Sequence, residues 1–110
     1  MQPLRRILHV DDDEDIRAIT KAALELIGNF HVVQFASGID AVKNAMAHAP
    51  QVLLIDMMMP GMNGLQTWER LSSLPGLETA PAIFVTAKSD EAFSNRVIDQ
   101  GAFAVVTKPF

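Results

Sequence analysis

The sequence predicts an α/β domain built on one parallel sheet, and three observations lead to this prediction. Short apolar runs alternate along the chain with longer segments whose apolar residues recur every three or four positions. Several of the short runs consist almost entirely of Val, Ile, Leu or Phe. Such continuous apolar runs are typical of strands that are covered on both faces of a sheet. The repeated order of strand and helix implies parallel strands joined by right-handed crossovers.

Five apolar runs are the predicted strands, and they span residues 5–10, 31–36, 51–56, 81–86 and 102–107. Helical patterns separate them. The first has Asp13 as its predicted N-cap and Gly28 as its end, with an apolar stripe made of Ile16, Ile19, Ala23, Leu26 and Ile27. The second begins at a Ser37 and Asp40 pair that resembles a capping box, and it ends before Pro50.

The last two predicted helices are marked by their apolar residues and their breakers. Leu65, Trp68 and Leu71 lie on one face of the third helix, which ends before Pro75 and Gly76. The fourth helix has Ser89 as a candidate cap and ends at Gly101, with Phe93, Val97 and Ile98 as its apolar residues. Trp68 is predicted to be a core residue.

The bulk composition excludes several classes of protein. At 110 residues the chain forms one domain, residues 1–110, and its formal net charge of −4 with no basic stripe argues against binding to nucleic acid. The absence of cysteine excludes disulfides and thiolate metal sites. There is no signal-peptide pattern and no apolar stretch near the ~20 residues of a membrane span. We therefore expect a soluble, cytoplasmic domain with no contact to a membrane.

Five polar groups stand where the apolar runs end. Asp11 and Asp12 follow the first run, Asp56 ends the third, Thr86 ends the fourth and Lys108 follows the fifth. Sites in open α/β sheets lie outside the carboxyl ends of the strands, so we expect these groups to converge there.

Three converging carboxylates imply a counter-ion, because two unit charges at 4 Å repel by ~4 kcal/mol at an effective dielectric constant of 20. Mg²⁺ fits best, with Mn²⁺ as an alternative ion, since a hard cation prefers carboxylate oxygens. A carboxylate beside a divalent cation, the Lys108 ammonium and the Thr86 hydroxyl is typical of phosphoryl transfer. Asp56 is the predicted nucleophile, because Asp11 and Asp12 are adjacent and better placed to hold a metal, and the product is an aspartyl phosphate.

Four segments resemble a two-component response-regulator receiver domain over essentially the whole chain. They are Val10-Asp11-Asp12-Asp13, Ile55 to Gly64, Val85-Thr86-Ala87 and Lys108-Pro109-Phe110, in the family's order and spacing. The resemblance implies a flavodoxin-like, doubly wound, five-stranded sheet with strand order 2-1-3-4-5. It also implies phosphorylation of Asp56 by a sensor histidine kinase or a phosphotransfer protein. Such a domain is a switch that assists its own phosphorylation and dephosphorylation, with no metabolic substrate.

The resemblance further assigns the ligands and the contacts of the phosphoryl group. It implies that Asp12, Asp56 and the backbone carbonyl of Met58 bind Mg²⁺ directly, and that Asp11 binds it largely through water. Thr86 and Lys108 contact the phosphoryl group in the family.

Other functions fit the sequence less well. A calcium-binding loop starting at Asp11 fails, because its sixth position is Ile16 rather than Gly. A phosphatase with an aspartate nucleophile needs a second acid where Met58 stands, and a flavin phosphate is repelled by the acids after the first strand. A phospho-independent interaction module on the same fold stays as the alternative.

The chain departs from the family at two places. Val105 occupies the position of the usual aromatic switch residue, and Phe103 stands where an exposed acid is frequent, which suggests a hydrophobic patch for a partner. The sequence also stops where the fifth helix of a receiver begins. We expect a truncated receiver domain with the fifth helix absent, either as a fragment of a longer regulator or with the missing cover supplied by a second copy in a homodimer.

Overall fold

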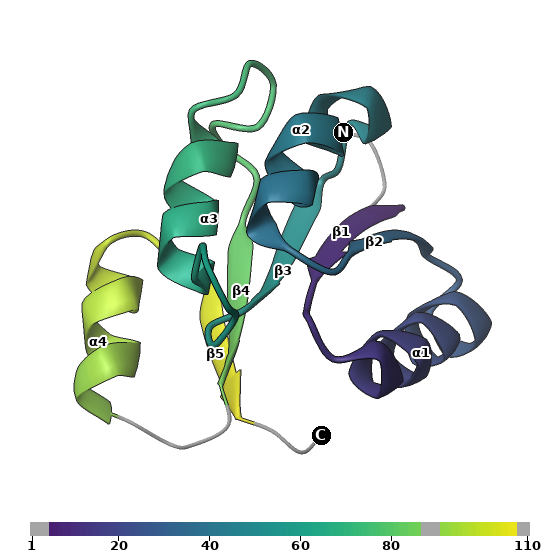
Figure 1. Ribbon diagram of the computed structural model, residues 1–110, viewed down its shortest axis with the longest axis horizontal. Coiled ribbons are helices and arrows are strands. Elements are labelled where there is room, and N and C mark those ends of the chain that lie inside the picture. Colours follow the sequence, from purple (N-terminus) through teal and green to yellow (C-terminus); the bar gives the residue numbers. More distant parts are fainter. Residues whose placement is uncertain (1–4, 87–90, 108–110) are drawn as a thin grey trace.

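The computed structural model describes residues 5–86 and 91–107, in which five strands form one parallel sheet ordered β2-β1-β3-β4-β5 (Figure 1). The strands are β1 (Arg6–Val10), β2 (His31–Phe35), β3 (Val52–Asp56), β4 (Ala82–Thr86) and β5 (Ala104–Thr107). The helices are α1 (Glu14–Ala22), a π-helical turn η1 (Ala23–Ile27), α2 (Gly38–His48), α3 (Gly64–Ser72) and α4 (Glu91–Asp99). The predicted fold class, the five strands and the strand order are confirmed.

The strand order places helices on both faces of the sheet. From β1 the chain moves outward to β2 and then returns past β1 to β3, so the direction of the crossovers reverses at β1. Because each crossover is right-handed, this reversal puts α1 on one face and the later helices on the other. Figure 1 shows α1 on one side of the sheet, with α3 and α4 on the opposite side.

The main core lies between the sheet and helices α2, α3 and α4. Alternate residues of the strands point into it, and Leu8, Leu53 and Phe84 are each 0% exposed. The Trp68 ring of α3 packs edge-on against Phe84, with ring centroids 5.4 Å apart, so its predicted place against the core is confirmed. This face of the sheet is therefore closed by three helices.

Two predicted helix starts are confirmed, and the structure adds a cap that was not predicted. The Asp13 side chain accepts hydrogen bonds from the backbone N–H groups of Asp15 and Ile16, and Ser37 Oγ accepts one from the N–H of Asp40. The added cap is a reciprocal box at the start of α3, in which Asn63 Oδ1 accepts from the N–H of Gln66 and Gln66 Oε1 accepts from the N–H of Asn63. Ser89, the cap predicted for α4, lies outside the described residues.

The apolar stripe predicted for the first helix is largely exposed: Ile19, which lines an apolar groove, is 61% exposed, and the last two residues of the stripe are more exposed still. Leu26 and Ile27 are 84% and 87% exposed, whereas Thr20 is buried and Leu24 is half-buried. The cause is the π-helical turn, in which the N–H of Gly28 donates to the carbonyl of Ala23, five residues earlier. This wider turn adds a residue to the helix and rotates Leu26 and Ile27 away from the sheet.

An apolar groove lies beside α1 on the second face of the sheet. It has a volume of about 430 Å³ and is lined by Ile7, Ile19, Thr20, Ala23, Leu24, Val52, Leu54, Ile83, Val85 and Val106. We call it the α1-side groove. Four α-helices lie within the described residues, and β5 ends at Thr107, the last of these residues. None of the helices in the described ranges is long and apolar enough to cross a membrane.

Candidate metal centre at the carboxyl edge of the sheet

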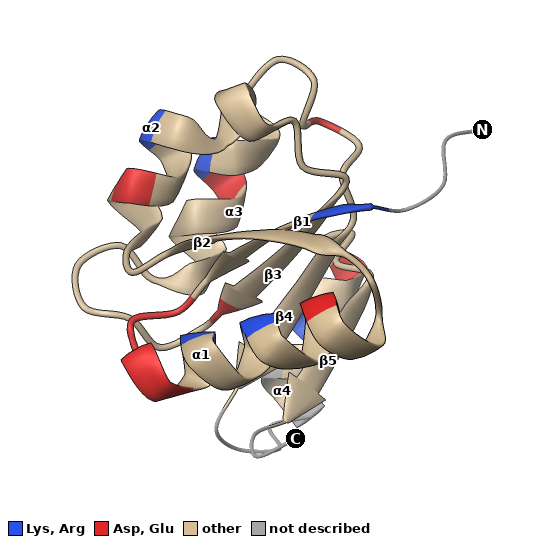
Figure 2. Cartoon of the chain, turned by 90° about the vertical axis from the view of Figure 1, so that its right-hand side faces the viewer, with Lys and Arg blue, Asp and Glu red and all other residues tan. Residues whose placement is uncertain are grey.

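The pairing of β1 with β3 brings the three predicted carboxylates together. Val10 of β1 pairs with Ile55 of β3, so Asp11 and Asp56 are the next residues on two neighbouring strands. One carboxylate oxygen from each of Asp11, Asp12 and Asp56 lies within 4.8 Å of the others. Figure 2 shows acidic segments from the end of β1, the start of α1 and the end of β3 gathered at one corner of the molecule.

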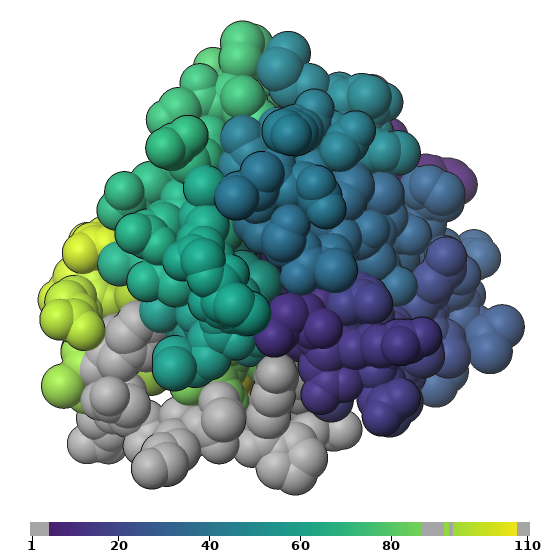
Figure 3. All heavy atoms as spheres, in the orientation of Figure 1, coloured from purple at the N-terminus to yellow at the C-terminus, as the bar shows by residue number. Residues whose placement is uncertain are grey.

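The three carboxylates differ in their exposure to solvent. Asp11 is 0% exposed and Asp56 is 3% exposed, whereas Asp12 is exposed. In Figure 3 the segment that begins α1 lies beside the segment that follows β3. Two buried acids with an exposed third form a site that is anchored in the fold and open to solvent through Asp12.

Backbone hydrogen bonds fix the two strands that carry the site. The N–H of Asp11 donates to the carbonyl of Phe35 at 3.1 Å, and the N–H of Met57 donates to the carbonyl of Val85 at 2.9 Å. Asp11 Oδ1 also accepts from the N–H of Asp13 at 2.9 Å, which turns the chain from β1 into α1. The carboxylates are thus placed by the central strands of the sheet.

The donor set fits a hard divalent cation. All three groups are carboxylates, which Mg²⁺ and Mn²⁺ accept as ligands, and a bound cation offsets the repulsion between them. Met58 is 74% exposed, and its thioether sulfur is a poor ligand for a hard cation, so any role of this residue at the site falls to its backbone carbonyl. That role of the carbonyl stays a prediction.

The structure describes one of the two remaining predicted groups. Thr86 ends β4 and is half-buried, one residue past Val85, which pairs with Asp56. Thr86 therefore lies at the same edge of the sheet as the acids. Thr86 also pairs with Thr107, the last residue of β5. Lys108 comes directly after Thr107 and lies outside the described residues.

Three further residues near the acids were missed by the sequence analysis as parts of the site. His9 is 0% exposed in the middle of β1, and its Nε2 lies 4.0 Å from Asp11 Oδ2. The Arg17 guanidinium of α1 donates to the carbonyl of Asp11 at 2.7 Å, and Gln34 of β2 contacts both His9 and Arg17. The available signal was a polar histidine inside an apolar strand, two residues before Asp11.

Comparison with known proteins assigns the family. The family model for the response regulator receiver domain matches residues 7–110. The chain belongs to this family. Receiver domains are phosphoacceptor switches of two-component systems rather than enzymes with a metabolic substrate, and the family resemblance inferred from the motifs is confirmed.

The curated relatives are longer than this receiver domain. It is 36% identical over 102 residues to the C4-dicarboxylate transport transcriptional regulatory protein DctD of Rhizobium meliloti, covering 92% of the chain and 21% of that protein. It is 33% identical to the transcriptional regulatory protein KdpE of Mycobacterium tuberculosis, covering 94% of the chain and 44% of the relative. The chain thus spans less than half of either relative.

Solved structures share the fold. The chemotaxis protein CheY4 of Vibrio cholerae superposes with a TM-score of 0.90 at 23% identity, covering 98% of the chain and 89% of that protein. The N-terminal domain of a response regulator receiver protein from Methanoculleus marisnigri gives a TM-score of 0.86 at 28% identity, covering 97% of the chain and 86% of that one.

Proposed function

We propose that this receiver domain accepts a phosphoryl group on Asp56 from a sensor histidine kinase or a phosphotransfer protein, in a reaction that needs Mg²⁺. The observation that carries the proposal is the meeting of Asp56 with Asp11 and Asp12 within 4.8 Å at the carboxyl edge of the sheet. Asp56 is buried, and the end of a central strand holds it in place. A nucleophile reacts fast only when it is held in a fixed position relative to the group that it attacks.

The chemistry is a phosphoryl transfer from a phosphohistidine donor to a carboxylate acceptor. A carboxylate oxygen of Asp56 attacks the phosphorus of a phosphohistidine, the P–N bond breaks, and its electron pair stays with the imidazole nitrogen. The product is an acyl phosphate on Asp56. Mg²⁺, when bound, neutralises the phosphoryl oxygens and offsets the repulsion among the acids.

The other residues have supporting roles in this proposal. Asp11 and Asp12 hold the metal together with Asp56 and the Met58 carbonyl. The Thr86 hydroxyl donates to a phosphoryl oxygen, and the Lys108 ammonium neutralises part of its charge. The same groups assist the later hydrolysis of the aspartyl phosphate. The new charge shifts an equilibrium between two conformations and so controls a partner or an output domain.

The setting of the switch is part of the proposal. The relatives DctD and KdpE are named as transcriptional regulatory proteins, and the chain matches only a part of each. We infer that residues 1–110 form the receiver part of a cytoplasmic regulator and that the output lies in another domain or partner.

A second candidate is a phospho-independent interaction module, and two exposed features favour it. Phe103 is 72% exposed beside β5, and the α1-side groove is apolar. Val105 stands in place of the usual aromatic switch residue and is half-buried against the core. The aromatic side chain that would respond to phosphorylation is therefore absent at this position. A homodimer belongs to this candidate, and sedimentation of the unphosphorylated domain at increasing concentration tests it.

Intact mass measured after incubation with acetyl phosphate separates the two candidates. We expect one added phosphoryl group in the presence of Mg²⁺, and none in its absence or in the Asp56→Asn variant. Asp13→Asn is the matched control, because an asparagine still caps α1 and Asp13 is outside the metal cluster. Equal labelling of Asp56→Asn, or no labelling of the wild type with Mg²⁺, contradicts the proposal.

A further inference from the structure

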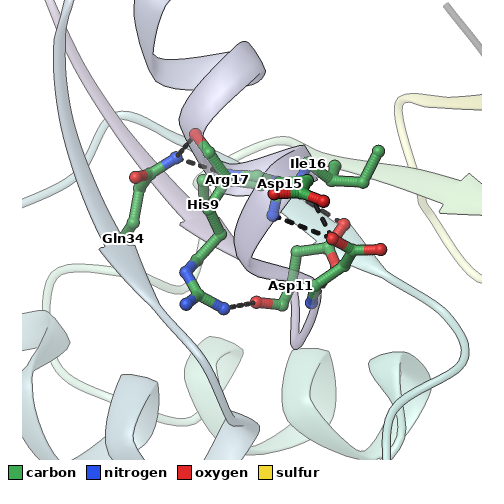
Figure 4. A network of polar contacts seen from close by, with 7 residues as sticks. His9, Asp11, Asp15, Ile16, Arg17 and Gln34 are labelled. Carbon is green, nitrogen blue, oxygen red and sulfur yellow. Dashed lines mark hydrogen bonds and ion pairs between the residues drawn. The ribbon is translucent and has the colours of Figure 1, made fainter.

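The residues behind the acidic site form a hydrogen-bonded network that begins at a buried histidine. His9, Arg17 and Gln34 come from β1, α1 and β2, and Figure 4 shows them grouped behind Asp11. His9 faces the α1 side of the sheet, opposite to the core residues Leu8 and Val10 that flank it. Nothing in the function proposed above uses this network.

The hydrogen bonds of Gln34 define its orientation. Gln34 Nε2 lies 2.7 Å from the backbone carbonyl of Arg17, which can only accept, so this atom must be the amide nitrogen. The same nitrogen lies 3.0 Å from His9 Nδ1. An amide nitrogen donates through both of its hydrogens and accepts none. His9 Nδ1 is therefore the acceptor in this contact.

The tautomer of His9 follows from this contact. When Nδ1 accepts, the ring proton of a neutral imidazole is on Nε2. Nε2 lies 4.0 Å from Asp11 Oδ2, and both side chains are almost completely buried. This distance is longer than a hydrogen bond, so the contact is a charge–dipole interaction, strengthened by the low dielectric of the interior. The protonated nitrogen of His9 is thus the ring nitrogen that lies next to the carboxylate of Asp11.

The other side of Asp11 is held by the same network. Its Oδ1 accepts from the N–H of Asp13 at 2.9 Å, and its carbonyl accepts from the Arg17 guanidinium at 2.7 Å. Arg17 in turn is fixed through its own carbonyl by Gln34. The Asp11 carboxylate therefore meets the N–H of Asp13, the N-cap of α1, at Oδ1 and His9 at Oδ2, while Arg17 holds the backbone carbonyl of the same residue.

We propose that His9, oriented by Gln34, is a positioning residue that directs its Nε2–H at Asp11 and so preorganises this carboxylate for a divalent cation. The proposal rests on the metal-dependent function proposed above. Partners that orient a metal ligand typically change metal affinity by 10–100-fold when they are removed. His9 itself contacts neither the metal nor the phosphoryl group in this proposal.

Two amide variants of His9 each keep one of its two contacts. In His9→Gln the amide nitrogen can take the place of Nε2 and still face Asp11. In His9→Asn the side chain is shorter, so its amide reaches only the place of Nδ1, next to Gln34. Titration calorimetry with Mg²⁺ measures the dissociation constant for both variants and for the wild type. We expect about a tenfold weaker affinity for His9→Asn and a change within about twofold for His9→Gln.

A role in packing alone predicts another pattern. Equal losses in both variants, no loss in either, or a loss only in His9→Gln would each overturn the proposal. Urea unfolding without Mg²⁺ confirms that the variants are folded. Should His9→Asn fail to fold, the ¹⁵N spectrum of the wild-type imidazole decides: a proton on Nε2 supports the proposal, and a proton on Nδ1 alone refutes it.

Failure of this inference can be told apart from failure of the proposed function. A wild-type domain that neither binds Mg²⁺ nor takes up a phosphoryl group from acetyl phosphate contradicts the proposed function. A wild-type domain that does both, with His9→Asn binding Mg²⁺ equally well, removes only the positioning role of His9.

Discussion

Gly64 is the residue at which a single added methyl group has the most informative effect. It is the first residue of α3, directly after the N-cap Asn63, and its N–H donates to the carbonyl of Met57 at 3.1 Å. A Cβ at this position would lie 2.5 Å from the carbonyl oxygen of Asp56 and 2.9 Å from the Cα of Met57. Both neighbours are backbone atoms, so no side chain can move aside to make room.

Two opposing contributions set the expected change in the free energy of unfolding for Gly64→Ala. Alanine favours a helix over glycine by up to about 1 kcal/mol. Overpacking against a fixed neighbour costs about 1–3 kcal/mol, and two backbone contacts under 3.0 Å place this site at the upper end. We expect a net loss of about 2 kcal/mol. With a urea slope of about 2 kcal/mol/M, the unfolding midpoint falls by about 1 M.

Urea unfolding followed by the fluorescence of Trp68 measures this change, and Gly61→Ala is the matched control. Gly61 has a φ of +75° and no atom within 4 Å of the added Cβ, so its substitution tests backbone strain without a clash. We expect a loss of about 1 kcal/mol for the control. The reasoning is refuted if Gly64→Ala is as stable as the wild type, because helix propensity would then outweigh the contact with Asp56.

Four other substitutions test the packing, the capping and the surface. Phe84→Ala removes a fully buried ring that packs against Trp68, and we expect thermal or urea unfolding to report a loss of about 3–5 kcal/mol. Asn63→Ala removes the cap of α3, and the expected loss is about 1 kcal/mol, while Gln66→Ala should lose less. Phe103→Asp should change the free energy of unfolding by less than about 0.5 kcal/mol, because the ring is 72% exposed. If partner binding or self-association is unchanged in Phe103→Asp, the predicted hydrophobic patch is wrong.

The strands and the metal cluster could be predicted because they depend on local patterns with a fixed geometry. Continuous apolar runs identified β1 and β3, and parallel strands always present their carboxyl ends at one edge. Once β1 pairs with β3, no further information is needed to bring Asp11 and Asp56 together. The Asp13 cap was predictable for the same reason, since it depends only on residues 13–16.

The features that were missed depend on contacts between elements far apart in the sequence. The orientation of Gln34 depends on the carbonyl of Arg17 and on the ring of His9, and no spacing rule relates these three residues. The exposure of Leu26 and Ile27 was also missed, because helical periodicity assumes 3.6 residues per turn throughout and the π-helical turn changes the phase.

The α1-side groove has a thermodynamic consequence for the domain. The heat capacity of unfolding grows with the apolar surface that becomes newly hydrated, at about 12–15 cal/mol/K per residue in domains with closed cores. Side chains such as Leu54 and Ile83 line the groove, and part of their surface is already hydrated in the folded chain. We therefore expect calorimetry to give a heat capacity of unfolding below this range while the α1-side groove is open to water. The value should rise when the groove is covered, so it measures whether this face of the sheet is hydrated or buried.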